Sequence, residues 1–211
     1  MVKKAAKKPR KPADESAPVG PKAELSLRSF TSAAEFERWL RAHHERSKGI
    51  WLRLMKKSSP EPGVSYAEAL DVALSFGWID GQLKTHDAHS WLRKFVPRSP
   101  RSIWSKINRD KALALIAAKR MAPAGLAEVE RAKKDGRWSA AYDSPRNAEP
   151  SAEFAAALAA SPRAAAFFAT LNGANRYAVL FRLQAPKLAE TRARKIRELI
   201  SMLEQGKKIH G

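Results

Sequence analysis

Residues 65–97, SYAEALDVALSFGWIDGQLKTHDAHSWLRKFVP, decide the fold because their pattern changes from helix to strand within a few positions. Ser65 is a typical N-cap, and the apolar residues after it cover so wide an arc that the helix must be largely buried. Gly77 ends this helix. Residues 78–85 and 91–96 are β-rich and are separated by a polar turn, so we expect two neighbouring strands.

The sequence before this stretch predicts one more strand and one more helix. The run Ile50–Met55 is β-rich and ends at a segment with two prolines. Upstream, Thr31 or Ser32 can cap a helix with apolar residues at helical spacing, namely Phe36, Trp39 and Leu40. A helix followed by a β-α-β-β unit predicts an α+β lobe over residues 25–102, with a small, mostly antiparallel three-stranded sheet.

The second half of the chain is rich in Ala, Leu, Lys, Arg and Glu, which favour helix, and is interrupted by Pro and Gly. Helices are predicted over residues 103–118, 123–134, 151–159, 162–171, 174–184 and 187–204. We therefore expect residues 103–211 to form an all-helical lobe that packs on the first lobe in one compact, helix-dominated unit.

The N-terminus is different in kind. Residues 1–24 are rich in Lys, Pro and Ala and have almost no residue that forms a core, so we expect a disordered basic arm. Its first 22 residues hold seven basic and two acidic side chains, a net charge of +5. The other residues still have a net charge of +14 out of +19. A folded body this basic attracts polyanions, although a high charge can also serve solubility alone.

Composition excludes several classes of site. The chain has no cysteine, which rules out disulfides, iron–sulfur clusters, cysteine-ligated zinc and thiol nucleophiles. It has no apolar run long enough to cross a bilayer and no apolar stretch after the basic start, so we expect a cytoplasmic protein with no transmembrane segment. Phosphate-loop, dinucleotide, hydrolase and metalloprotease motifs are absent, and the histidines offer only weak clusters. We predict no catalytic residue, no metal and no cofactor.

The strongest candidate for a binding site is residues 91–120, which hold nine basic residues and one acid. Arg98, Arg101 and Lys106 are close enough in sequence to converge on one phosphate or carboxylate, next to Trp104 and the start of a helix. Ser102, Ser105 or Asn108 can cap that helix. The alternative is that these arginines stack on tryptophan or pair with a carboxylate such as Asp80 for structural reasons.

Asp80 is the only carboxylate that the sequence suggests for chemistry. It lies between Gly77 and Gly81, with Gln82 two positions along, and a general base at Asp80 is conceivable. An Asp before Gly more often organises a turn through its own backbone, and no second carboxylate or nucleophile lies at a diagnostic spacing.

Ordered blocks of this sequence resemble the YdeI/OmpD-associated family of bacterial proteins. The resemblance extends from about Phe30 to His210 through FERWLRAHH, GIWLRLMKKSS, SYAEALDVALSFGWIDGQ, FVPRSPRSIWSKIN, RMAPAGLAEVERAKKDGRW and NRYAVLFRLQAPKLAETRARKIRELISMLEQGKKIH. It implies a role in protection against bacteriocins and other antimicrobial peptides, and it implies no catalytic residue. One departure is Lys119, which stands where a glycine is expected before Arg120.

Three functions follow from these features. The first is a non-enzymatic protein that binds an anionic ligand or a protein partner in a cationic, aromatic-walled pocket, formed by Lys56, Trp78, Asp80, Gln82, Arg98, Arg101, Trp104, Lys106 and Asn108. The second is weak, non-specific nucleic-acid binding, through Lys7, Lys8, Arg10, Lys11, Arg98 and Arg101. The third is an enzyme for a small phosphorylated or carboxylated substrate, with Asp80 near the two arginines.

Overall fold

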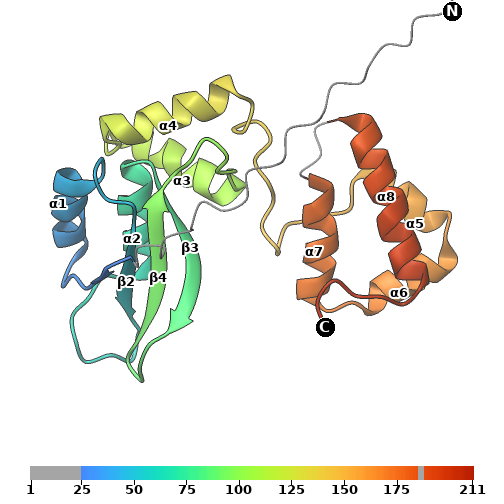
Figure 1. The fold of residues 1–211 in the computed structure, drawn as a ribbon, viewed down its shortest axis with the longest axis horizontal. Coiled ribbons are helices and arrows are strands. Elements are labelled where there is room, and N and C mark those ends of the chain that lie inside the picture. Colours follow the sequence, from blue (N-terminus) through green and yellow to red (C-terminus); the bar gives the residue numbers. More distant parts are fainter. Residues whose placement is uncertain (1–24, 185–187) are drawn as a thin grey trace, which may run out of the picture.

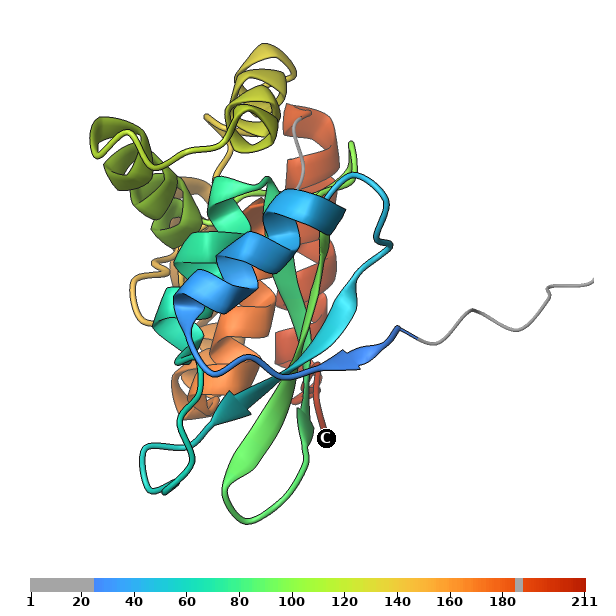
Figure 2. The ribbon, with the colours of Figure 1, turned by 90° about the vertical axis from the view of Figure 1, so that its left-hand side faces the viewer.

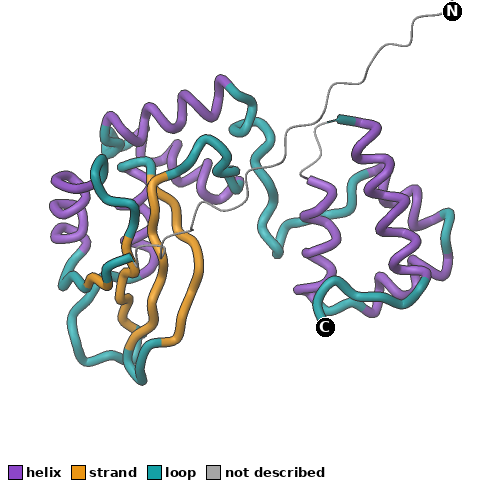
Figure 3. The backbone as a smooth tube through the Cα atoms, viewed as in Figure 1, coloured by secondary structure: helices purple, strands orange, loops and turns teal. Residues whose placement is uncertain are grey.

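The structure is a computed structural model that describes residues 25–184 and 188–211. The predicted basic arm, residues 1–24 with Lys7, Lys8, Arg10 and Lys11, lies outside the described residues. Two bodies are joined by one connecting segment (Figure 1). All described strands belong to the first body, and the second contains only helices and turns (Figure 3).

The first body is built on a four-stranded mixed sheet of order β1-β2-β4-β3. Its strands are β1 (Leu27–Arg28), β2 (Ile50–Met55), β3 (Trp78–Thr85) and β4 (Ser90–Pro97). The three predicted strands pair antiparallel, as expected, but β1 adds a parallel neighbour to β2 that the sequence did not indicate. A two-residue strand has too few positions to show alternation, so the expected three-stranded sheet was one strand short.

Two helices cover one face of this sheet, α1 (Ala33–His43) and α2 (Tyr66–Ser75) (Figure 2). Their starts are fixed locally, because the hydroxyl of Ser32 accepts from Glu35 N–H and Ser65 forms a capping box with Glu68. Alternation along β2 points three fully buried side chains toward the helices, namely Ile50, Leu52 and Leu54.

Helices α3 (Lys106–Ala117) and α4 (Pro123–Lys134) pack against α2 and belong to the first body. Gly125 lets α4 approach closely, since a Cβ there would lie 2.2 Å from the carbonyl oxygen of Ser75. Lys119, where the family resemblance led us to expect glycine, is the only non-glycine residue with positive φ among the described residues (φ 56°). The turn therefore keeps a glycine-like conformation despite the lysine.

The second body has its own hydrophobic core, formed by α5 (Ala152–Ala159), α6 (Pro162–Thr170), α7 (Gly173–Gln184) and α8 (Ala189–Glu204). We expected one helical lobe from residue 103, but α3 and α4 share a core with α2 instead, and the second core begins at Ala148. The C-terminal half also contains an isolated parallel bridge, Ser105 to Tyr142, so it is not entirely helical. Over the described ranges, none of the helices combines the length and apolar character needed to span a membrane.

Candidate functional site

Arg98 is the predicted site residue whose surroundings differ most from those of a surface cation. It follows β4 directly, and only 5% of the residue is exposed. Its guanidinium carbon lies 3.7 Å from the centroid of the Trp104 ring, and Nη1 donates to the carbonyl oxygen of Ile103 at 3.2 Å. Because burial removes most of the hydration of the charged form, the pKa of Arg98 falls to about 10.

Three buried N–H donors in this place have no hydrogen-bond partner within the described ranges. They are Nε and Nη2 of Arg98 and Nε1 of Trp104. Nε and Nη2 lie on one edge of the guanidinium plane, the edge that binds a carboxylate or phosphate through two parallel hydrogen bonds. Since buried polar groups in proteins are almost always paired, this edge calls for an oxyanion or an ordered water.

Two further aromatic residues adjoin Trp104. Trp138 packs edge-on against Trp104, with 4.9 Å between ring centroids, and the backbone N–H of Tyr142 donates to the carbonyl oxygen of Trp104 at 3.0 Å. We call Arg98, Trp104, Trp138 and Tyr142 the Arg98 cluster. Burial, followed by the negative charge of Asp80, raises the pKa of Tyr142.

The loop after β4 is held by arginines, which supports the structural alternative stated above. Besides the bond from Arg98 to Ile103, Arg137 Nη1 donates to the carbonyl oxygen of Ser102 at 2.7 Å, and Arg131 Nη2 donates to that of Arg98 at 3.4 Å. Arg137 also pairs with Asp135 at 2.7 Å. Part of the positive charge in this segment therefore fixes the backbone of the loop.

Asp80 is paired within the sheet. It lies in β3 beside a register shift, where its Oδ2 accepts from the Tyr66 hydroxyl at 2.8 Å and from Arg93 Nε at 2.9 Å. Arg93 also forms an ion pair with Asp80, and its guanidinium carbon lies 5.3 Å from the centroid of the Tyr66 ring. Asp80 is therefore held by α2 and β4, and not by an arginine near the start of α3.

This pairing predicts a measurable pH dependence of stability. Burial, and then the charge of Asp80, raises the pKa of Tyr66 to about 12. A phenol whose pKa is higher in the folded than in the unfolded state stabilises the fold below about pH 10 and loses that contribution between about pH 10 and 12. The difference in free energy of unfolding between the wild type and Tyr66→Phe should therefore shrink over this interval. Urea titrations followed by tryptophan fluorescence measure it, and a constant difference would contradict the assignment.

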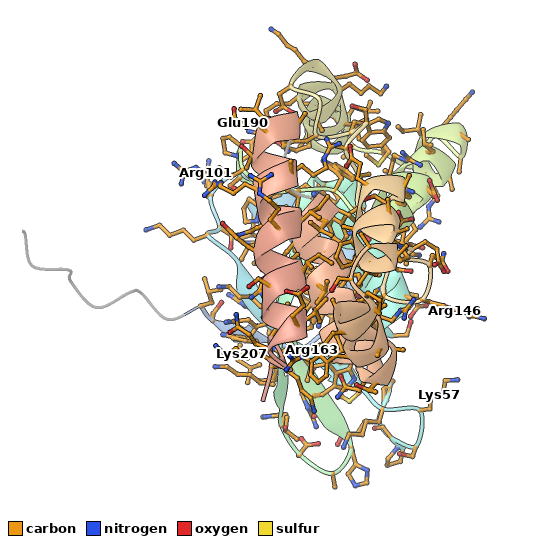
Figure 4. The ribbon with its side chains drawn as sticks, turned by 90° about the vertical axis from the view of Figure 1, so that its right-hand side faces the viewer. Lys57, Arg101, Arg146, Arg163, Glu190 and Lys207 are labelled. Carbon is orange, nitrogen blue, oxygen red and sulfur yellow. The ribbon has the colours of Figure 1, made fainter. Side chains whose placement is uncertain are left out.

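The other predicted site residues do not gather around Arg98. Arg101 is exposed and points away from the body (Figure 4), and Lys106 forms an ion pair with Asp143 at 2.8 Å. Trp78 is a core residue, packed edge-on against Trp39. The remaining three lie in different environments: Lys56 donates to backbone carbonyls of the β3–β4 turn, Gln82 is exposed at the register shift, and Asn108 is buried in the first turn of α3. Of the expected pocket, Arg98 and Trp104 form a cation–π contact, and none of the hydrogen bonds or ion pairs among the described residues joins two of the nine residues.

The structure forms a cleft of about 820 Å³ elsewhere, between the end of α1, the end of α2 and the start of α4. Its floor is apolar, with Val72, Phe76 and Met121, and its rim includes Arg41 and Arg120. No residue of the predicted pocket lines it. Within the described ranges, no group of three or more His, Asp or Glu side chains is placed to hold a metal ion.

Tyr142 and Asp143 connect the Arg98 cluster to the helical body. The Tyr142 ring meets Phe181 of α7 edge-on, with 5.1 Å between centroids. The backbone of Asp143 donates to Gln184 Oε1 at 2.8 Å, and its carbonyl accepts from the Tyr177 hydroxyl at 3.0 Å. Tyr142, Tyr66 and Arg93 were not among the predicted site residues, because isolated tyrosines and a strand arginine have no local pattern that marks their partners.

Comparisons with known proteins match the two bodies of the chain to two different family models. Residues 28–128 match the model of a domain of unknown function (DUF8412), and residues 147–206 match the family described as "Bacteriocin-protection, YdeI or OmpD-Associated". The resemblance seen in the sequence is thus confirmed over the helical body, while the blocks between residues 28 and 128 match a different model. Searches of the curated proteins and of the solved structures found no match.

Proposed function

We propose that this chain, whose residues 147–206 match the YdeI/OmpD-associated family, is a cytoplasmic, non-enzymatic anion-binding protein with a role in bacteriocin tolerance. The ligand is a small compound with a carboxylate or phosphate group, and the Arg98 cluster binds it. The observation that supports this most directly is the unpaired edge of the Arg98 guanidinium.

The geometry favours an oxyanion over other ligands. The Nε and Nη2 atoms offer two parallel donors, and Trp104 Nε1 offers a third in the same buried environment. Low hydration there strengthens a charge-assisted hydrogen bond relative to one at the surface. Because the donor atoms are covered, the ligand enters when the loop at residues 99–103 opens. Four residues of that loop are exposed, namely Ser99, Pro100, Arg101 and Ile103.

Electrostatics limits how such a protein can act in tolerance. The chain has a net charge of +19, and a cationic protein repels cationic peptides, so direct capture of the peptide is disfavoured. An anionic ligand is compatible with this charge. Tyr142 is the member of the Arg98 cluster that contacts α7, and it supplies a physical path from the bound ligand to the helical body, whose residues 147–206 match the family.

The hydrogen bonds of Asp80 argue against a role for this carboxylate in acid–base catalysis. Its Oδ2 already accepts from two side chains, Tyr66 and Arg93, so a general-base role would first have to break the ion pair with Arg93. The enzyme hypothesis therefore has less support from the geometry than the binding hypothesis.

Thermal unfolding in sodium phosphate and sodium citrate, at constant ionic strength, tests the proposal. We expect each effective anion to raise the Tm of the wild type by several degrees at about 100 times its Kd, which corresponds to about 2.7 kcal/mol. Arg98→Met should abolish the shift without lowering the Tm of the free protein, because the variant no longer buries an unpaired charge.

Arg101→Met is the matched control. Arg101 is exposed and lies three residues after Arg98, so this variant loses the same charge but should keep the anion-dependent shift in Tm. If Arg98→Met unfolds at a lower temperature and the anions stabilise it as they do the wild type, then Arg98 only holds the loop, and the proposal is wrong.

A further inference from the structure

The face of the sheet opposite α1 and α2 is not covered by any described helix (Figures 1 and 2). Alternation along the strands places a second set of side chains on this face. Residues that lie opposite each other on paired strands point to the same face. Trp51 of β2 lies opposite Lys94 of β4, and Leu92 of β4 lies opposite Lys84 of β3. Leu27 of β1, which pairs with Trp51, is 52% exposed. We call Leu27, Trp51, Lys84, Leu92 and Lys94 the open face.

Two cations of the open face have no carboxylate partner. Lys84 Nζ lies 4.2 Å from the centroid of the Trp51 ring, and neither Lys84 nor Lys94 makes an ion pair within the described ranges. The neighbouring Arg53 is different, since it pairs with Glu61 at 3.1 Å and Asp87 at 3.2 Å. The acids of this region thus compensate Arg53 and leave the two lysines available.

The charge of the first body complements a polyanion. Residues 25–146 contain 23 Lys and Arg against 13 Asp and Glu, a net charge of +10. An indole beside unpaired ammonium groups matches the alternation of base and phosphate in a nucleic-acid strand. A sheet surface suits unstacked bases, which lie flat on aromatic rings, whereas reading a duplex usually requires an element that enters a groove.

We propose that the open face binds single-stranded nucleic acid. A base stacks on Trp51 when the Lys84 ammonium leaves the ring for a phosphate, and Lys94 contacts a second phosphate. This site shares no residue with the Arg98 cluster, since Arg98 follows the end of β4 and contacts Trp104 and the carbonyl oxygen of Ile103.

Fluorescence anisotropy with a labelled 20-nucleotide oligothymidylate, measured between about 50 and 200 mM salt, tests this proposal. Each phosphate contact in a single strand contributes about 0.7 to the slope of log K against log salt. We therefore expect the double variant Lys84→Gln/Lys94→Gln to reduce the slope by about 1.4. The control Lys134→Gln/Lys207→Gln removes the same charge from α4 and from the C-terminal segment and should change the slope by less than half as much.

The stacking contact has its own variant. Trp51→Leu should weaken binding by about 5- to 150-fold, the equivalent of 1–3 kcal/mol for one stacked base, whereas Trp51→Phe keeps an aromatic ring and should bind within a few-fold of the wild type. The circular dichroism spectrum and Tm of each variant check its fold. If Trp51→Leu does not fold, the lysine pair still decides the question.

The proposal is overturned by no binding at 50 mM salt, by equal slopes for the two double variants, or by unchanged affinity in folded Trp51→Leu. Equal binding of a 20-base-pair duplex with no effect of Trp51 would indicate attraction by net charge alone, and would also contradict it. Arg98→Met should bind the oligonucleotide like the wild type, so failure here and failure of the anion proposal are distinguishable.

Discussion

Replacing Asp80 with alanine is expected to lower the free energy of unfolding of the first body by about 3 kcal/mol. The side chains of Asp80 and Arg93 are only 11% and 23% exposed, so the substitution leaves a poorly hydrated guanidinium without its counter-ion. It also removes the acceptor of the Tyr66 hydroxyl. Urea unfolding followed by tryptophan fluorescence measures the loss, because all six tryptophans lie between residues 39 and 138.

Asp71→Ala is the matched control for this experiment. Asp71 pairs with Lys111 at 2.6 Å, but both side chains are 33% exposed, so we expect a loss of less than about 1 kcal/mol. The double variant Asp80→Ala/Arg93→Met should be more stable than Asp80→Ala alone, because it no longer contains the uncompensated cation. Equal losses in Asp80→Ala and Asp71→Ala would show that the Asp80 pair is effectively solvated.

Asn175→Ala should destabilise the helical body by about 3 kcal/mol, since it removes several hydrogen bonds of a buried side chain at once. Asn175 is 2% exposed. Its Oδ1 accepts from the N–H groups of Ile209 (3.1 Å) and His210 (2.8 Å), and its Nδ2 donates to the carbonyl oxygen of His210 (3.2 Å). The side chain thus fastens the C-terminal segment to α7, and alanine leaves those backbone groups unpaired.

Circular dichroism at 222 nm is the measurement for this variant, because the helical body contains no tryptophan. We expect the helix signal to be lost earlier in urea than in the wild type, while the fluorescence transition stays in place. Hydrogen exchange should show lost protection at Ile209 and His210. Asn147→Ala, at an exposed position, is the control and should change stability by less than about 0.5 kcal/mol. A fluorescence midpoint that moves with Asn175→Ala would instead indicate that the two bodies unfold together.

Much of the local structure was predictable because short-range signals agree with the final fold. The strand Ile50–Met55, the strand Trp78–Thr85 and the helix Pro123–Lys134 have the predicted limits. Each is defined by its own alternation or helical spacing and by a Ser, Pro or Gly at its end. Lys119 is a different case, because only the family resemblance led us to expect a glycine there, and the structure shows that the lysine adopts a positive φ of 56°.

The candidate site was predicted only in part. The segment after β4 does contain a buried Arg–Trp contact, but adjacency in sequence suggested that Arg98, Arg101 and Lys106 would converge, and they point to a Trp ring, to solvent and to Asp143. Successive residues of a loop can face any direction, and the backbone path of residues 98–103 depends on hydrogen bonds from arginines some 30 residues later.

By itself, the sequence determined the helices, three strands, the net charge and the family of the helical body. The tertiary structure alone decided that β1 joins the sheet, that α3 and α4 pack against α2, and that Tyr66, Asp80 and Arg93 form one polar group. The physical reason is the distance along the chain over which each kind of interaction acts. Caps, turns and periodic patterns act over a few residues, whereas strand register and the burial of a charge depend on groups brought together from distant parts of the chain.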